Sequence, residues 1–268
     1  MPITAKRRTA VAGSFYPGTE KEMSKEVNRL LGDSRVEREV AGCISPHAGW
    51  MYSGEVAGAL FGSIKIPDSI ILIGPNHRGL GERVAIDSAN AWEFPFGDVP
   101  VDRELAKKIA SDCEHVRFDS AAHMMEHSLE VLVPFLYYRN KNIRIVPVSL
   151  GTQRAQTLKM LGSAIGKRAS ESGSLVISSS DLSHFLTDSE ARERDRRTIE
   201  QIVEFTEESI IDILKSDNAL CGVSSVSTLL WAAGEMGATK AELVEYANSG
   251  DITGDLDRVV GYASFIIS

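Results

Sequence analysis

Residues 68–74 read DSIILIG, and this short stretch decides the fold class. An unbroken apolar run of this kind is typical of a strand that is covered on both faces, as the strands of a parallel sheet are. Similar strands are predicted at residues 40–45, 83–87, 143–150, 174–180, 241–247 and 258–267. Helical patterns lie between them, at residues 19–32, 102–112, 127–138, 153–169, 190–216 and 223–235, and a further helix after the turn at His47 carries Val56, Leu60, Phe61 and Ile64. Because short apolar strands alternate with helices, the sequence predicts an α/β fold, a layered α/β/α sandwich with a largely parallel or mixed central sheet.

Two further segments add detail to this prediction. Thr19 and Glu22 stand at the spacing of a capping box, and Gly32 follows the last apolar position, so these residues set the ends of the first helix. Residues 88–100, SANAWEFPFGDVP, are expected to be an irregular stretch. No linker, repeat or low-complexity segment interrupts the sequence, so we expect a single domain over residues 1–268.

The composition excludes several classes of function. The chain has 268 residues, 43% of them hydrophobic and 25% charged, with a formal net charge of -8. Surfaces that bind nucleic acid are basic, so this acidic chain is not expected to have a nucleic-acid partner. No apolar run approaches the roughly 20 residues that span a bilayer, and the first residues lack the apolar core of a secretory signal. Three distant cysteines, Cys43, Cys113 and Cys221, favour reduced thiols and a cytoplasmic location over a disulfide framework.

Histidines follow the ends of three predicted strands. In the segments SPHAG, GPNH and SSSDLSH these are His47, His77 and His184, and Asp181 accompanies the last of them. In open α/β sheets, ligands bind beyond the carboxyl ends of the strands. A single histidine at such a place is more often structural. Three of the six histidines at one expected edge favour a shared site.

Two imidazoles need a further partner to hold a transition metal, because each neutral ring offers one lone pair. The residues that could supply it are Cys221, Asp181, Glu126 and His184. Cys221 stands just before a predicted helix, whose N-terminus favours a thiolate; the alternative is a small buried hydrophobic residue. Glu126 and His127 begin another predicted helix, where they either contact the same site or serve only the helix dipole and the surface.

Seven motifs of this chain occur in the order seen in the MEMO1 family: AGSFYPG, PHAGWMYSG, GPNH, EHSLEVLVPFL, SSDLSH, CG, and NSGDITGD followed by VVGYASF. The chain therefore resembles that family over nearly its whole length. The resemblance implies the fold of the class III extradiol dioxygenase large subunit, the catalytic part of non-haem iron ring-cleaving enzymes. It also implies His47, His77 and Cys221 as metal ligands, where the dioxygenases have a carboxylate as third ligand.

The resemblance further implies roles for the residues around these ligands. His184 would be the acid–base histidine, and Asp181 and His127 would line the same cavity. If dioxygen binds there, His184 is expected to move protons and Asp181 to orient it. Glu126 is expected as a further contact of substrate or ligands, as is Trp50, which stands where the family more often has Tyr. Genomic company with AMMECR1-like and radical-SAM proteins is also implied, with an unknown small molecule or peptide as the binding partner.

The donor set leaves several functions open. Two imidazoles and one thiolate suit Fe(II) or copper, and zinc as well. The function expected first is a metal-dependent redox enzyme of the dioxygenase-like class. A zinc hydrolase that polarises a water molecule is the second hypothesis, and a non-catalytic module that holds a peptide or a metal is the third. The thiolate favours redox chemistry or metal holding over hydrolysis.

Overall fold

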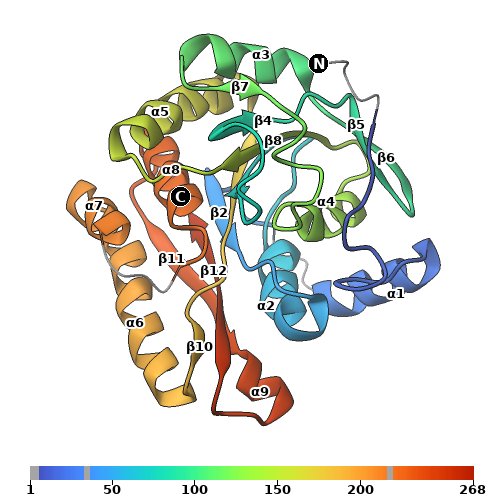
Figure 1. Ribbon diagram of the computed structural model, residues 1–268, viewed down its shortest axis with the longest axis vertical. Coiled ribbons are helices and arrows are strands. Elements are labelled where there is room, and N and C mark those ends of the chain that lie inside the picture. Colours follow the sequence, from blue (N-terminus) through green and yellow to red (C-terminus); the bar gives the residue numbers. More distant parts are fainter. Residues whose placement is uncertain (1–5, 33–36, 216–219) are drawn as a thin grey trace.

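A mixed β-sheet forms the middle layer of the protein. The computed structural model describes residues 6–32, 37–215 and 220–268 (Figure 1). Four parallel strands occupy the middle of the sheet, in the order β2 (Gly42–Ser45), β9 (Leu175–Ser179), β3 (Ser69–Pro75) and β8 (Arg144–Leu150). Beyond β2 lie β12 (Val259–Ile267), β11 (Ala241–Asn248) and β10 (His184–Leu186), and beyond β8 lie β4 (Val84–Ile86) and β7 (Arg117–Phe118). The pairs of β12 with β2 and of β4 with β8 are antiparallel, so the sheet is mixed.

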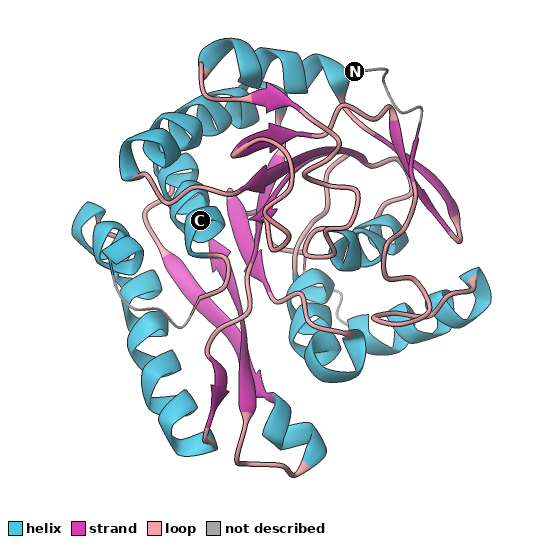
Figure 2. Cartoon of the chain, viewed as in Figure 1, coloured by secondary structure: helices cyan, strands magenta, loops and turns pink. Residues whose placement is uncertain are grey.

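Helices cover both faces of this sheet (Figure 2). One face carries α3 (Arg103–Asp112), α5 (Ala155–Ser172), α6 (Asp188–Glu204), α7 (Glu207–Lys215) and α8 (Val223–Glu235). The other face carries α1 (Glu20–Leu31), α2 (Trp50–Ser63) and α4 (Val133–Arg139), with the 3-10 turn η1 (Glu130–Leu132) before α4. The short helix α9 (Ser249–Thr253) lies between β11 and β12 in the chain. The predicted α/β/α layering is confirmed. None of the helices in the described ranges is long and apolar enough to cross a membrane.

Strand β3 shows how the sequence builds two cores at once. Successive side chains of a strand point to opposite faces of the sheet. Ile70 and Leu72 therefore pack against the α1, α2 and α4 side, whereas Ile71 and Ile73 pack against the side of α5 and α8. All four side chains are fully buried, and burial of each contributes about 1.5–3 kcal/mol. Burial on both faces explains why the apolar run in residues 68–74 is unbroken.

A second, three-stranded sheet is formed by β1 (Lys6–Arg7), β5 (Ala91–Phe94) and β6 (Gly97–Pro100). The expectation that residues 88–100 are irregular is therefore wrong. Trp92 and Phe94 are buried on either side of the exposed Glu93, which is the alternation of a strand. Gly97 turns the chain with a φ of 119°, a conformation that favours glycine. The hairpin packs its aromatic side chains into the core on the α1, α2 and α4 side.

Two helix boundaries differ from the prediction. The helix expected from residue 127 begins at Glu130, because the carboxylate of Glu126 accepts the N–H groups of the next two residues and holds them in a turn. The helix expected at residues 190–216 is two helices, α6 and α7, because Phe205 adopts a φ of 47° between them. Its expected end at residue 216 lies outside the described residues.

Candidate metal site

Three loops meet at the carboxyl edge of the parallel strands. β2, β9 and β3 are neighbours and run in the same direction, so the residues that follow them lie side by side. His47, Asp181 and His77 each come two residues after the end of one of these strands. The structure therefore places these three residues, which the sequence analysis grouped because each follows a strand, at one edge of the sheet.

His47, His77 and Cys221 form a group whose potential ligand atoms all lie within 4.8 Å of one another. Cys221 Sγ is 3.2 Å from His47 Nε2. His47 is buried, whereas 30% of the His77 side chain is exposed, so the group opens to solvent on the His77 side. His77, Glu126 and His127 form a second, equally close group of potential ligands.

Hydrogen bonds fix which ring nitrogen of His47 faces the cysteine. Its Nδ1 lies 2.7 Å from Ser179 Oγ. The single hydroxyl hydrogen of Ser179 is donated to the carbonyl oxygen of Ser128, 2.6 Å away, so Ser179 Oγ accepts from the His47 Nδ1–H. Nε2 of the neutral ring therefore carries the lone pair, on the side of Cys221.

His77 is held in the same tautomer by a carboxylate. Glu126 Oε1 lies 2.9 Å from His77 Nδ1, and Oε2 accepts the His77 backbone N–H at 2.7 Å. Burial raises the pKa of Glu126, but its hydrogen bonds with His77 and Ser128 outweigh burial and lower the pKa to about 2. An ionised carboxylate only accepts, so Nδ1 bears the hydrogen and Nε2 is left for a metal. Carboxylates orient metal-binding imidazoles in this way in many metalloproteins.

Gly222 sets the direction of the Cys221 thiol. The Cys221 N–H donates to the carbonyl oxygen of Asp181 at 3.3 Å, and the Gly222 N–H donates to Ser180 Oγ at 3.0 Å. A Cβ at position 222 would collide with the carbonyl of Ser179 and the side chain of Ser180, so this close approach requires glycine. The approach brings Sγ to the histidines, and the Asp181 N–H donates to Sγ at 3.2 Å.

Asp181 connects two of the loops. Its Oδ1 accepts the N–H groups of His47 at 2.7 Å and of Ala48 at 3.3 Å. Burial raises the pKa of the Asp181 carboxyl, against the opposing effect of these donors. Asp181 was expected to orient His184; in this structure His184 Nδ1 lies 2.8 Å from the carbonyl oxygen of Leu182. Asp181 positions the turn that carries His47.

Burial acts in opposite directions on the two donors that face each other. It lowers the pKa of His47 well below its usual range, and the imidazoles of His77 and His127 lower it further, so the ring is neutral at pH 7. Burial raises the pKa of the Cys221 thiol, and the charge of Asp181 adds to the effect. A metal would displace that thiol proton on binding. Two nitrogen lone pairs and one ionisable sulfur that converge on one point fit a transition-metal ion.

A cavity of about 450 Å³ opens beside this group. His127, Asp181 and His184 line it, and its walls also include the aromatic side chains of Phe15, Tyr52 and Tyr262. Burial lowers the pKa of His127. A cavity of this volume lies within the range of about 300–1,000 Å³ that is typical of small-molecule sites.

Trp50 lies in the hydrophobic core, and it is not among the described residues that line the cavity. Its indole N–H donates to the carbonyl oxygen of Val131 at 3.0 Å, and its ring packs against Phe135 and Tyr16. Trp50, which was expected as a contact of substrate or ligands, therefore packs in the core. The side chain anchors the start of α2 instead.

Several residues of the site carry no motif signal that singles them out. Ser179 and Ser128 orient His47, and their partnership joins segments that are 51 residues apart. Both serines stand within quoted motifs, SSDLSH and EHSLEVLVPFL, and Ser179 belongs to a run of three serines, residues 178–180, at the end of an otherwise apolar strand. Phe15 and Tyr52 lie within motifs, but nothing in their spacing indicates a shared wall.

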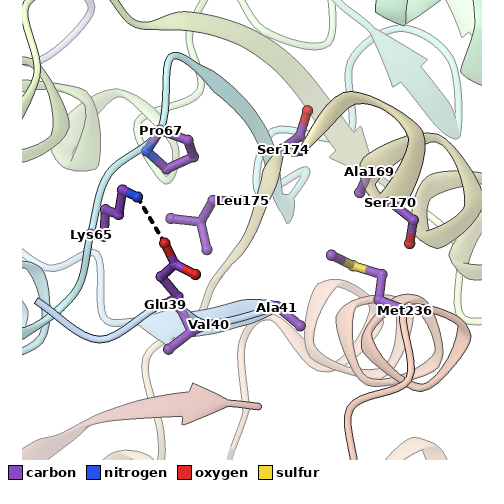
Figure 3. Close-up of a pocket in the computed structure, with 11 residues that line it drawn as sticks. Glu39, Val40, Ala41, Lys65, Pro67, Ala169, Ser170, Ser174, Leu175 and Met236 are labelled. Atoms are coloured by element: carbon purple, nitrogen blue, oxygen red, sulfur yellow. Dashed lines mark hydrogen bonds and ion pairs between the residues drawn. The ribbon is translucent and has the colours of Figure 1, made fainter.

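A second cavity of about 450 Å³ lies at the opposite, amino edge of the parallel strands (Figure 3). It is lined mainly by apolar and small side chains, among them Val40, Leu175 and Met236, and by the exposed ion pair of Lys65 with Glu39. The Lys65 Nζ to Glu39 Oε1 distance is 2.8 Å. No described histidine or cysteine lines this cavity.

Sequence comparison agrees with the motifs. A family model described as Memo-like protein matches residues 7–266. A MEMO1 family protein of Methanosarcina barkeri is 40% identical over 266 residues, which cover 97% of this chain and 99% of the relative. One of Aquifex aeolicus is 37% identical over 263 residues, with coverage of 97% and 98%. The chain belongs to the MEMO1 family.

A solved structure shares the fold at low sequence identity. An uncharacterized protein from Escherichia coli K12 superposes with a TM-score of 0.54 at 12% identity, covering 85% of this chain and 99% of the other. Likeness at this identity concerns the layered α/β architecture alone.

Proposed function

We propose that His47, His77 and Cys221 bind one transition-metal ion, with Fe(II) or copper preferred over zinc, and that the protein uses it in dioxygenase-like redox chemistry on a small organic substrate. The observation that carries the proposal is the convergence of three ligating atoms within 4.8 Å, with lone pairs directed inward by fixed hydrogen bonds. The resemblance to ring-cleaving dioxygenases gives the class of reaction. When bound, iron or copper would supply electron-transfer chemistry.

The chain itself would bind the substrate and move protons. The cavity beside the donors offers aromatic walls at Phe15, Tyr52 and Tyr262 for an apolar body. His184 donates its Nδ1–H to the carbonyl of Leu182, so Nε2 of the neutral ring is free to accept a proton from the substrate. His184 is therefore the proposed acid–base residue, and Asp181 is a positioning residue.

The first test is metal content after anaerobic purification, followed by dioxygen uptake with catechols as the first probes. We expect His184→Ala to keep the metal stoichiometry and to lose turnover by roughly 10²–10⁴-fold, as for a lost general acid–base group. Leu136→Met, a volume-conserving change in the core away from the site, is the matched control.

Two outcomes would redirect the proposal. If His184→Ala loses its metal as completely as His47→Ala does, His184 is a ligand and the acid–base role is wrong. If the zinc-loaded protein hydrolyses esters or amides while the Fe(II)-loaded protein consumes no dioxygen, the site is a hydrolase, in which the free His184 Nε2 would serve as base. Peptide binding that survives loss of all three ligands would indicate an adaptor.

A further inference from the structure

Glu126, the carboxylate that orients His77, stands in an irregular loop. The loop comprises residues 119–129, between β7 and η1. Within it, the Glu126 N–H donates to the carbonyl oxygen of His123 at 3.2 Å, which closes a single short turn. One turn does not fix the position of a side chain that has to meet a second loop. The placement of Glu126 therefore depends on contacts from other parts of the chain.

Arg7 of β1 makes two such contacts, although it is more than 100 residues away in the chain. Its Nε–H donates to the carbonyl oxygen of His123 at 2.8 Å, and its Nη2 donates to the carbonyl oxygen of Glu126 at 2.5 Å. These carbonyls lie at the two ends of the short turn, so one guanidinium holds both ends. Because the second carbonyl belongs to Glu126 itself, Arg7 fixes the backbone from which the carboxylate reaches His77.

The guanidinium of Arg7 is itself held in place. Only 3% of the side chain is exposed, and Nη1 lies 2.8 Å from Oε2 of the fully buried Glu130. Nη1 also donates to the carbonyl oxygen of Arg8 at 3.3 Å, and the guanidinium carbon lies 4.1 Å from the centre of the Trp92 ring. A guanidinium carries five N–H groups in a rigid fork and can therefore bond these separate acceptors at once. A lysine has all its donors on one nitrogen and cannot.

The carboxylate of Glu130 has further partners that fix its position. It accepts the N–H groups of Ala10 at 2.7 Å and Val11 at 3.0 Å, and the hydroxyl of Tyr16 at 2.8 Å. Hydrogen-bonded groups of this kind are what a buried charge needs in order to stay ionised. Arg7 is therefore fixed from one side by a fully bonded carboxylate, and its Nε–H and Nη2–H are directed at the loop.

We propose that Arg7 is a positioning residue for the metal site. Arg7 holds the backbone of Glu126, Glu126 holds the Nδ1–H of His77, and Nε2 of His77 is thereby directed at the metal. The inference rests on the proposed function as far as the metal is concerned. The effect of Arg7 on the His77 ring, however, is a property of the metal-free protein and can be measured there.

Arg7→Lys tests the proposal, because lysine keeps a positive charge beside Glu130 but cannot hold both carbonyls of the loop. Long-range proton–nitrogen NMR spectra of the metal-free full-length protein show which ring nitrogen of each histidine carries the hydrogen. We expect the hydrogen of His77 on Nδ1 in the parent, and a mixture of the Nδ1–H and Nε2–H forms in the variant. His47, which Ser179 orients, should keep its tautomer in both proteins and is the internal control.

The affinity for Fe(II) is the second readout. In Arg7→Lys it should fall by about tenfold, the lower end of the range for loss of an outer partner, because Glu126 itself remains. Arg139→Lys is the matched control: Arg139 also pairs with a carboxylate, that of Glu37 at 2.7 Å, and donates to a carbonyl oxygen, that of Ile64 at 3.3 Å. This control should change neither readout. Urea unfolding of both variants shows whether their losses of stability are comparable.

Two results would overturn the proposal. One is an unchanged His77 tautomer in a folded Arg7→Lys protein, and the other is an equal change in Arg139→Lys. A protein that binds no metal but whose His77 tautomer responds to Arg7→Lys contradicts only the proposed function. The two proposals can therefore fail separately.

If Arg7→Lys does not fold, hydrogen exchange of the parent protein decides. The His77 N–H donates to the carboxylate of Glu126, and the Ala10 N–H donates to that of Glu130. Since Arg7 joins the two carboxylate-bearing segments, both amides should be released by one opening event and show the same opening free energy. A His77 amide that exchanges much faster than the Ala10 amide would contradict the proposal.

Discussion

The two edges of the central sheet carry cavities of equal volume, about 450 Å³ each, and differ in almost everything else. At the carboxyl edge the wall holds His127, Asp181 and His184, next to the converging donors. At the amino edge the wall is apolar and small, with one solvent-exposed ion pair between Lys65 and Glu39 (Figure 3). Volume alone therefore does not identify a site. The two cavities differ because the segments that follow the parallel strands form one of them, and the segments that precede the strands form the other.

Topology accounts for this contrast. The carboxyl ends of β2, β9 and β3 lie side by side and lead into turns whose side chains converge. The amino edge instead receives the ends of α5 and α8, at Gly173 and Met236, which bring small or apolar groups. At the carboxyl edge, buried acids are held by backbone N–H groups, as Asp181 is by His47 and Ala48. Acidic groups can therefore be buried at the carboxyl edge, whereas the charged groups at the amino edge are exposed to solvent.

Removal of a ligand is the change with the largest expected effect. His47→Ala, His77→Ala and Cys221→Ser should each lower metal affinity by more than about 100-fold, beyond the 10–100-fold that is typical when only a hydrogen-bond partner of a ligand is lost. Loop residues contribute little to the core, so the fold should persist. Anaerobic calorimetric titration with Fe(II) measures the effect, with circular dichroism as the check on folding. Unchanged affinity in all three variants would refute the assignment.

A change at Glu126 should have a smaller effect. Glu126→Gln keeps the size of the side chain but replaces the ionised acceptor that holds His77 Nδ1–H. We expect metal affinity to fall by about 10–100-fold, because His77 loses its fixed orientation. Glu39→Gln at the amino edge is the matched control and should change nothing in the same titration. Equal effects of the two substitutions would remove the distinction between the edges.

The pH dependence of metal binding tests the buried thiol. Burial raises the pKa of Cys221, so the thiol is protonated in the metal-free protein and binding releases its proton. His47 has a lowered pKa and is already neutral, so it releases none. Affinity should therefore rise about tenfold per pH unit between roughly pH 6 and 8, in step with one proton released. In Cys221→Ser this slope should be lost; a slope that stays would place the titrating proton elsewhere.

The smallest effect is expected at the amino edge. Lys65→Met breaks the exposed pair with Glu39 and leaves the apolar wall of that cavity in place. Exposed pairs contribute little to stability, so urea unfolding curves of variant and parent should nearly coincide. Metal affinity should be unchanged. A marked loss of metal by this variant would mean that the two edges are coupled through the sheet.

Local patterns were enough to predict the strands and most helices of the central layers and to group the histidines at one edge of the sheet. The apolar run of β3 indicated a covered strand, and Thr19 and Gly32 limit α1 as predicted. His47 and His77 could be grouped because strand direction is a local inference once the sheet is parallel. Cys221 entered only as one of several candidates, and the resemblance to the MEMO1 family chose among them.

What the sequence could not supply depends on contacts between distant segments. Ser179 orients His47 only because its hydroxyl reaches Ser128, across 51 residues of chain. The hydrogen bonds of Asp181 to the turn at His47 were not predicted, since they depend on how two loops pack. Trp50 was assigned to the site from its neighbours in the motif, whereas helix direction turns its ring into the core.

X-ray absorption spectroscopy of the metal-loaded protein is the most direct test of the central claim, that two imidazoles and one thiolate share one ion. For the zinc-loaded protein the account predicts a single sulfur neighbour at about 2.3 Å and imidazole nitrogens at about 2.0–2.1 Å. The sulfur signal should disappear in Cys221→Ser, while the nitrogen signal remains. A coordination shell of the parent protein without sulfur, or with nitrogen and oxygen neighbours that His47→Ala and His77→Ala leave unchanged, would contradict the account.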